Sequence, residues 1–96
     1  MTPLKVLRVL VLYRRDFRRM SLEPARYSYG KRLISPKLAL CHCYWMINEM
    51  VVFIKAGRME KVFRWLGFIQ GVLWVLGMYS VEDIKNHNRP REEQPL

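Results

Sequence analysis

Apolar side chains recur at helical spacing in three long stretches of this chain, and proline and glycine separate the stretches. A Thr-Pro or Ser-Pro pair opens the first two, at residues 2–3 and 35–36, and places an N-cap residue before a proline at the first helical position. Gly57 and Gly77 follow the second and third stretches, as glycine commonly follows a helix end. The pattern therefore predicts helices over residues 4–20, 36–56 and 58–76.

The remaining segments are short or polar. Ser80 and Asp83 resemble a capping box, which predicts a short fourth helix that ends near His87. Residues 21–34 combine proline, glycine and three basic side chains, so we expect an irregular, exposed connection. Residues 88–96 contain two prolines, four charged side chains and no apolar period, and we expect a flexible C-terminal tail.

The predicted fold class is all-α. Only one or two residues around Gly57 join the second and third helices, and so short a connection makes them an antiparallel hairpin of residues 36–56 and 58–76. The N-terminal helix is expected to pack across this hairpin and the short C-terminal helix to close one end, in a single domain of residues 1–87. Trp74 is expected in the hairpin core, where Trp74→Ala would cost about 3–5 kcal/mol of stability.

The third predicted helix carries the residue types of a close helix–helix contact. Gly67 and Gly71 lie four residues apart on one face and remove side chains where another helix could approach, and Trp65 and Trp74 flank them. These four residues are the predicted helix-packing or oligomer contacts. The helix over residues 36–56 is apolar almost all round, which burial against a second subunit explains, so we expect a homo-oligomer.

A membrane location is the alternative for these apolar helices. Residues 65–81 contain no charged side chain, and a glycine pair four apart also suits a membrane helix pair. Gly77, however, leaves only about twelve apolar residues on that helix, and Glu49 interrupts the helix before it, whereas a span needs about 20. We favour a soluble hairpin, and sedimentation of the protein in the absence of detergent would reverse that choice.

Positive charge is concentrated at the start of the chain. Seventeen Lys and Arg against eight Asp and Glu give a net charge of +9, of which residues 1–37 contribute +8. Basic side chains interleave with Tyr27 and Tyr29, and cations beside aromatic faces suit a phosphate or a nucleobase. A solvated helix face is the other interpretation of the basic side chains in the first helix. The candidate anion-binding or nucleic-acid-binding residues are Arg8, Arg14, Arg15, Arg18, Arg19, Arg26, Lys31 and Arg32.

Catalytic and metal-binding patterns are missing. There is no Gly-rich phosphate loop, no HExxH and no nucleophile beside a base, so we expect no enzyme activity and no cofactor. Cys41 and Cys43 point apart on a helix and lack a second Cys/His pair, so we expect buried free thiols in a reducing cytoplasm and no metal. His42 and Glu49 share a helix face and are expected to form a structural polar patch that reaches Arg64.

Two stretches resemble a known group of proteins. Residues 57–74 read GRMEKVFRWLGFIQGVLW and residues 79–90 read YSVEDIKNHNRP. Both are similar to small helical proteins encoded by tailed phages and prophages, and residues 13–17 and 38–53 are similar more loosely. The resemblance implies a phage origin, and hence the cytoplasm of an infected bacterial host, without implying an activity.

Three functions remain open at this point. The first is a phage accessory protein that binds a host protein or an anionic host ligand and inhibits or regulates it, with a host defence among its suitable targets. The second is a nucleic-acid-binding protein that uses the basic N-terminal helix and loop. The third is a small membrane hairpin protein. The resemblance, the missing catalytic patterns and the surplus apolar surface favour the first.

Overall fold

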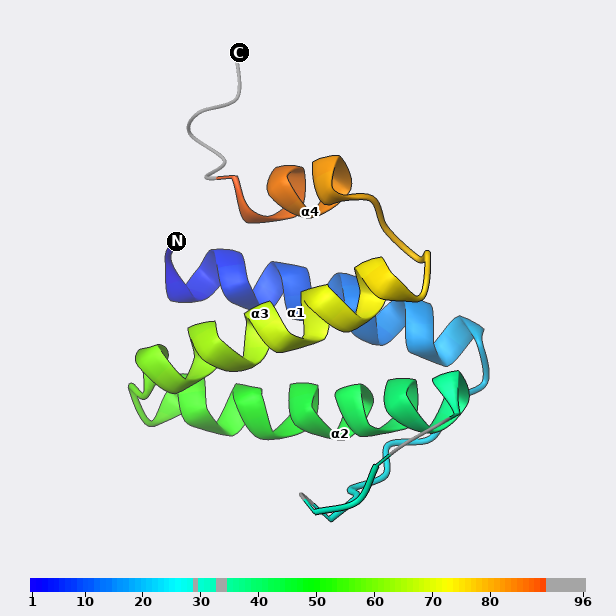
Figure 1. Cartoon of the computed structure of the whole chain (residues 1–96). Coiled ribbons are helices and arrows are strands. Elements are labelled where there is room, and N and C mark those ends of the chain that lie inside the picture. Colours follow the sequence, from blue (N-terminus) through cyan, green and yellow to red (C-terminus); the bar gives the residue numbers. More distant parts are fainter. Residues whose placement is uncertain (29, 33–34, 90–96) are drawn as a thin grey trace.

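Four α-helices make up all the regular structure in the described part of the chain, residues 1–28, 30–32 and 35–89 of the computed structural model (Figure 1). They are α1 (Pro3–Arg19), α2 (Pro36–Lys55), α3 (Met59–Val75) and α4 (Val81–Asn88). The predicted all-α class is confirmed. The three long helices end within one residue of their predicted ends, and α4 extends one residue beyond its predicted end.

The predicted N-terminal caps are all present. The Thr2 hydroxyl oxygen accepts a bond from the backbone N–H of Lys5 at 3.1 Å, and the Ser35 hydroxyl accepts one from Leu38 at 3.3 Å. Ser80 and Asp83 form a reciprocal capping box with bonds of 2.9 and 3.0 Å. Each cap satisfies backbone donors that have no partner inside the helix, and this explains why the helices begin there.

Two glycines end the long helices of the second half of the chain. Gly57 has φ = 76° and Gly77 has φ = 75°, in the left-handed region that glycine adopts without a steric penalty. The chain thereby reverses between α2 and α3, and the two helices lie side by side in opposite directions (Figure 1). Of the tail predicted for residues 88–96, Asn88 belongs to α4, and residues 90–96 lie outside the described part.

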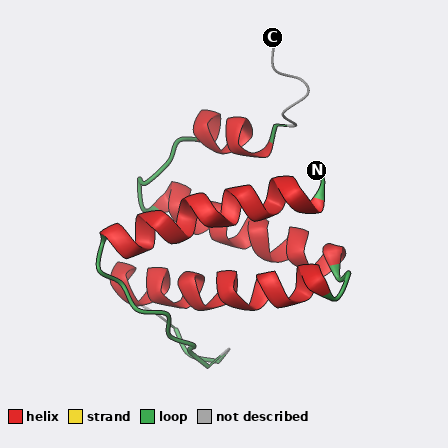
Figure 2. Cartoon of the chain, turned by 180° about the vertical axis from the view of Figure 1, so that it is seen from behind, coloured by secondary structure: helices red, strands yellow, loops and turns green. Residues whose placement is uncertain are grey.

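The helices are stacked in a fixed order. α1 and α3 occupy the middle of the molecule, α2 packs below them and α4 lies above them, on α1 (Figures 1 and 2). The described residues of the α1–α2 loop, 20–28, 30–32 and 35, lie on the far side of α2. The backbone N–H of Ala25 fastens this loop to the helix by donating to the carbonyl of Cys41 at 3.1 Å. As a result α2 is covered from three directions.

One apolar core lies between α1, α2 and α3. Its most deeply buried members are Val6, Tyr13, Phe17, Cys43, Ile47, Met50, Val62, Ile69 and Leu73. Cys41 and Cys43 are buried free thiols, as predicted, and burial raises the pKa of Cys43 to about 12. A thiol with so high a pKa stays protonated and unreactive near neutral pH.

The expectation that Trp74 belongs to this core is wrong. Trp74 is 53% exposed, whereas its neighbour Leu73 is fully buried, so Leu73 and not Trp74 faces the core. Gly67 and Gly71 are also exposed, and a Cβ atom added at either would meet no atom within 4 Å. Within the described part of the chain, no helix approaches these glycines closely. Trp65 differs, because it is partly buried against the ring of Phe53, with centroids 5.1 Å apart.

We expect the adjacent residues Leu73 and Trp74 to respond oppositely to truncation. Leu73→Ala leaves a cavity in the core and should lower the free energy of unfolding by about 2–5 kcal/mol. Trp74→Ala should lower it by about 1 kcal/mol or less, because half of that side chain already faces solvent. Urea unfolding followed by circular dichroism measures both. An equal decrease in the free energy of unfolding in the two variants would contradict the burial of Leu73 and the exposure of Trp74.

Candidate functional site

An open cavity of about 560 Å³ lies between the α1–α2 loop, α2 and α3. Its walls include four aromatic side chains: Tyr27 of the loop, Trp45 of α2, and Trp65 and Phe68 of α3. We call this feature the aromatic cavity. The helical repeat explains the wall residues, because positions three apart on a helix share one face, as Trp65 and Phe68 do.

Neighbouring rings form a continuous row along the cavity. Tyr27 lies 6.1 Å from His42, His42 lies 5.4 Å from Trp45, and Trp45 lies 6.0 Å from Trp65, between ring centroids. Phe53 continues the row, with its ring edge-on to Trp65. Tilted and edge-on contacts at these distances are favourable for aromatic pairs. The row holds the two indoles of the cavity in place without a ligand.

His42 provides a hydrogen-bond donor of fixed orientation. Its Nδ1 accepts a bond from the backbone N–H of Tyr27 at 3.0 Å, which requires Nδ1 to be unprotonated. Burial lowers the pKa of His42, and the nearby positive charge of Arg26 lowers it further. The imidazole is therefore neutral at pH 7 with its proton on Nε2, and a side chain that lines the cavity carries an N–H group ready to donate.

Cations lie against the aromatic walls. The Arg26 guanidinium is 5.4 Å from the ring centre of Trp45, and Lys31 Nζ is 5.9 Å from that of Tyr27. Lys61 Nζ lies 5.1 Å from the centre of the Trp65 ring. Cations at such distances are attracted by the electron-rich faces of the rings. Of the described residues that line the cavity, Lys31 and Arg64 are basic and none is acidic, and Arg64 is also paired with Glu60.

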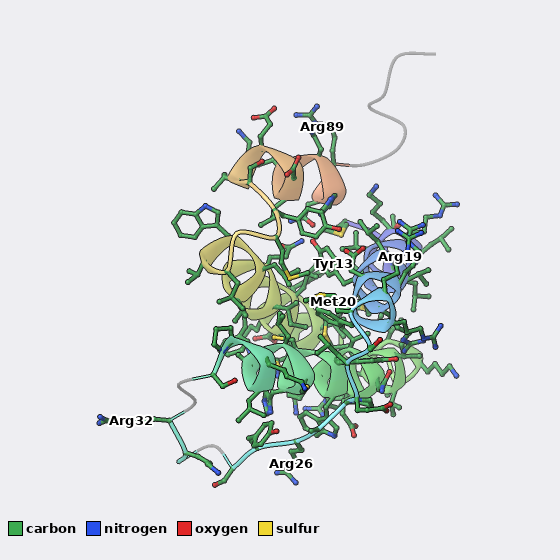
Figure 3. The ribbon with its side chains drawn as sticks, turned by 90° about the vertical axis from the view of Figure 1, so that its right-hand side faces the viewer. Tyr13, Arg19, Met20, Arg26, Arg32 and Arg89 are labelled. Carbon is green, nitrogen blue, oxygen red and sulfur yellow. The ribbon has the colours of Figure 1, made fainter. Side chains whose placement is uncertain are left out.

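The predicted basic residues fall into two groups in the structure. Arg26, Lys31 and Arg32 are exposed on the loop, and the first two lie against the aromatic rings of the cavity. Figure 3 shows Arg19 beside α1, away from Arg26 and Arg32 on the loop. Arg8, Arg15 and Arg19 are all exposed on α1, and none of them lines the aromatic cavity.

Arg14 and Arg18 serve the contact between α1 and α2. Arg14 donates from Nη2 to the Asn48 side-chain oxygen at 2.8 Å, and Arg18 donates from Nε to the Tyr44 hydroxyl at 3.3 Å. Both guanidinium groups are thus oriented by a neighbouring helix. Tyr29, predicted to contribute an aromatic face to the basic loop, lies outside the described residues.

The polar patch predicted for His42, Glu49 and Arg64 does not form as expected. His42 bonds to the loop backbone, and Arg64 pairs with Glu60 one turn away, at 3.1 Å. The arrangement instead brings His42 and Arg64 to the aromatic cavity. Trp65, predicted as a helix-packing contact, lines the cavity too. The i, i+3 spacing of Trp65 and Phe68 was the sequence feature that could have indicated this cavity. The sequence does not show, however, that the α1–α2 loop lies near these aromatic residues.

A second polar cluster ties α4 to the rest of the molecule. Gln70 is buried and donates from Nε2 to the Tyr13 hydroxyl at 3.0 Å, and Gln70 and Asn88 exchange side-chain bonds of 2.7 and 3.0 Å. The Tyr13 hydroxyl lies 2.8 Å from His87 Nδ1 and, having accepted from Gln70, donates its own proton there. We call Tyr13, Gln70, His87 and Asn88 the α4 latch. Every member has a partner, as buried polar groups require.

No family model, curated protein or solved structure matches the chain. Among the described residues, no group of three His, Cys, Asp or Glu side chains could hold a metal ion. α2 is long and apolar enough to cross a membrane by length and composition, a test that the core helix of a soluble protein also passes.

The α4 latch should make stability depend on pH. Burial lowers the pKa of His87 below 6.5. The negative charges of Asp83 and Asp16 act to raise this pKa, and the positive charge of Lys5 lowers it further. The unfolded chain then takes up a proton first as the pH falls, so the free energy of unfolding should decrease from pH 6.5 downward and level off below the folded-state pKa. Urea unfolding at pH 7.5 and 5.5 measures the decrease.

His87→Gln and His42→Gln separate the two contributions, because the pKa of His42 is lowered as well. Each substitution should reduce the difference in stability between pH 7.5 and 5.5, and His87→Gln should also weaken the α4 latch at pH 7.5. An unchanged pH dependence in His87→Gln would show that burial does not lower the pKa of His87 in the folded protein.

Proposed function

We propose that the protein is a binding protein, without chemistry of its own, that recognises an anionic partner at the aromatic cavity and its basic edge. The observation that carries this is the placement of Arg26 and Lys31 against the aromatic rings of an open cavity. Guanidinium and ammonium groups held over rings can bind an anion while the rings contact its apolar part. The antiparallel α2–α3 hairpin is the proposed frame for this site.

The biological role proposed is that of a phage accessory protein that binds a host protein or an anionic host ligand in the bacterial cytoplasm and alters its activity. Its support is the resemblance carried by residues 57–74 and 79–90, together with the apolar surface that α3 exposes. The resemblance bears on the origin of the protein, and the cavity bears on what the protein binds. The two are independent of each other.

A second candidate function is nucleic-acid binding on α1. Arg8, Arg15 and Arg19 are exposed along one helix, and Leu4 and Val11 are exposed beside them. A basic helix face can follow a phosphate backbone by charge alone. This face is separate from the aromatic cavity, so charge reversal can test each surface by itself.

Two double variants compare the surfaces: Lys31→Glu with Arg64→Glu at the cavity, and Arg15→Glu with Arg19→Glu on α1. Both change the net charge by the same amount. The probes are fluorescein-labelled inorganic polyphosphate and a labelled 20-nucleotide dT strand, measured by anisotropy. The cavity variant should weaken binding of both at least tenfold, and the α1 variant should change it less than twofold. If Lys31 and Arg64 each contact one phosphate of the dT strand, the affinity of the unmodified protein for that strand should fall about sevenfold when the salt concentration rises from 50 to 200 mM.

The opposite ranking of the two variants would support the nucleic-acid function of α1 and contradict the cavity. Absence of binding to either polyanion by the unmodified protein at 50 mM salt would overturn the proposed function. Circular dichroism of each variant confirms that its helices are intact.

We also propose that the protein forms a homo-oligomer through the outer face of α3. The exposed apolar residues of this face are Phe63, Gly67, Gly71, Trp74 and Val75, and the exposed side chain of Arg64 lies among them. The two glycines leave a notch four residues long between aromatic side chains, and such a surface can meet a second copy of itself about a two-fold axis. An apolar face of this kind is unusual on a helix that only contacts solvent.

Gly67→Ala and Gly67→Leu test the association. The added methyl group meets no atom within the chain, so Gly67→Ala should raise the stability of the monomer by about 0.5–1 kcal/mol. Gly67→Leu fills the notch and should shift an oligomer toward the 11.6 kDa monomer, measured by light scattering on a size-exclusion column. An unmodified protein that elutes as a monomer at 100 µM contradicts the oligomer, and one that sediments without detergent points to a membrane.

A further inference from the structure

We propose that the aromatic cavity binds the base of a nucleotide. The base would lie against the indoles and accept a hydrogen bond from His42 Nε2–H, and the phosphate would lie at Lys31 and Arg64. This inference rests on the proposed function and names the ligand class of the same site. A nucleotide in this sense is either a free mononucleotide or the end of a single strand, because both present the same base and phosphate.

The size and walls of the cavity suit a planar ring. A volume of about 560 Å³ falls in the range of about 300–1,000 Å³ that is typical of small-molecule sites. Trp45 and Trp65 are held 6.0 Å apart and tilted by 39°, and both line the cavity, so they present a fixed aromatic surface to a ligand. Stacking of a base on an aromatic side chain stabilises binding by about 1–3 kcal/mol and tolerates any base.

The polar side chains of the cavity are mainly donors. Lys31 and Arg64 carry only donors, and His42 offers only its Nε2–H because Nδ1 already accepts from Tyr27. No described lining residue is a carboxylate. The matching ligand is therefore rich in acceptors and negatively charged at one end.

His42 distinguishes a nucleobase from an aliphatic acid. A fatty acid would satisfy the cations and fill the apolar space, but its chain would cover the Nε2–H without a partner, and an unpaired buried donor is unfavourable. The ring nitrogens and carbonyl oxygens of a nucleobase can accept that bond. His42 lies between Tyr27 and Trp45 in the row of rings, so its imidazole adjoins an indole against which a base would stack.

Titration of the full chain with AMP and UMP, followed by tryptophan fluorescence and calorimetry, tests the inference. Both nucleotides should bind at least tenfold more tightly than ribose 5-phosphate, inorganic phosphate or laurate, and should quench the emission of the indoles. Trp45→Leu should weaken AMP binding at least tenfold, because it removes an indole against which the base would stack. Trp74→Leu, the matched control outside the cavity, should leave AMP binding unchanged.

Phe68→Ala provides a second variant in case Trp45→Leu does not fold, because Phe68 is 58% exposed and its loss does not open the core. It should weaken AMP binding at least threefold. A dinucleotide that binds more tightly than AMP indicates a strand end, and equal affinity indicates a free nucleotide, with the base in the cavity in both cases.

Three results would overturn the inference. They are equal affinity for AMP and ribose 5-phosphate, tighter binding of laurate than of AMP, and AMP binding that Trp45→Leu and Phe68→Ala do not change. If polyphosphate still binds in a manner that depends on Lys31 and Arg64, the proposed function stands without the nucleotide. Absence of binding to every one of these anions removes both.

Discussion

The rest of the structure depends on the need to bury α2. This helix has apolar side chains on nearly every side, and its buried residues include Leu40, Tyr44, Ile47 and Met50. Exposure of such a helix to water is unfavourable in proportion to its apolar area, so cover is needed from more than one direction. α1 and α3 cover the upper side and the α1–α2 loop runs along the lower side. The positions of α1, α3 and the described part of the loop follow from this requirement, whereas α4 is held by contacts with α1 and α3.

The aromatic cavity is a consequence of covering a helix with a loop. A second helix would interdigitate its side chains with those of α2, whereas the described part of the loop is attached to α2 by two backbone N–H donors, from Ala25 and Tyr27. Space is left between the loop, α2 and α3, and aromatic rings line it. The cations of the loop lie over those rings, because a loop must keep its charged groups near water. Burial, aromatic surface and positive charge thus meet at one place.

The α4 latch holds the molecule together by a different interaction. α4 contributes no residue to the buried apolar core, and it is fixed by side-chain hydrogen bonds to Tyr13 and Gln70. Tyr79 adds a bond from its hydroxyl to Asp16. Hydrogen bonds between side chains require particular partners and protonation states, whereas apolar packing does not. This end of the protein therefore responds to pH more than the core does.

The sequence by itself determined the helices, their boundaries and their caps. Those features depend on residues within one turn of each other, such as Ser80 with Asp83, or on the backbone of a single glycine. It also showed that the charge gathers near the N-terminus and that Cys41 and Cys43 are buried. Helical periodicity did not show whether Leu73 or Trp74 faces the core, since the two are neighbours and both are apolar.

Only the tertiary structure decided which distant residues meet. Tyr27 reaches His42 over fifteen residues of sequence, and Gln70 reaches Asn88 over eighteen. It also separated the basic side chains of α1 from those of the loop, which the composition of residues 1–37 had joined. Periodicity gives the apolar side of each helix, but the partner that covers it depends on how several elements share one core. The candidate site belongs to that second kind of information.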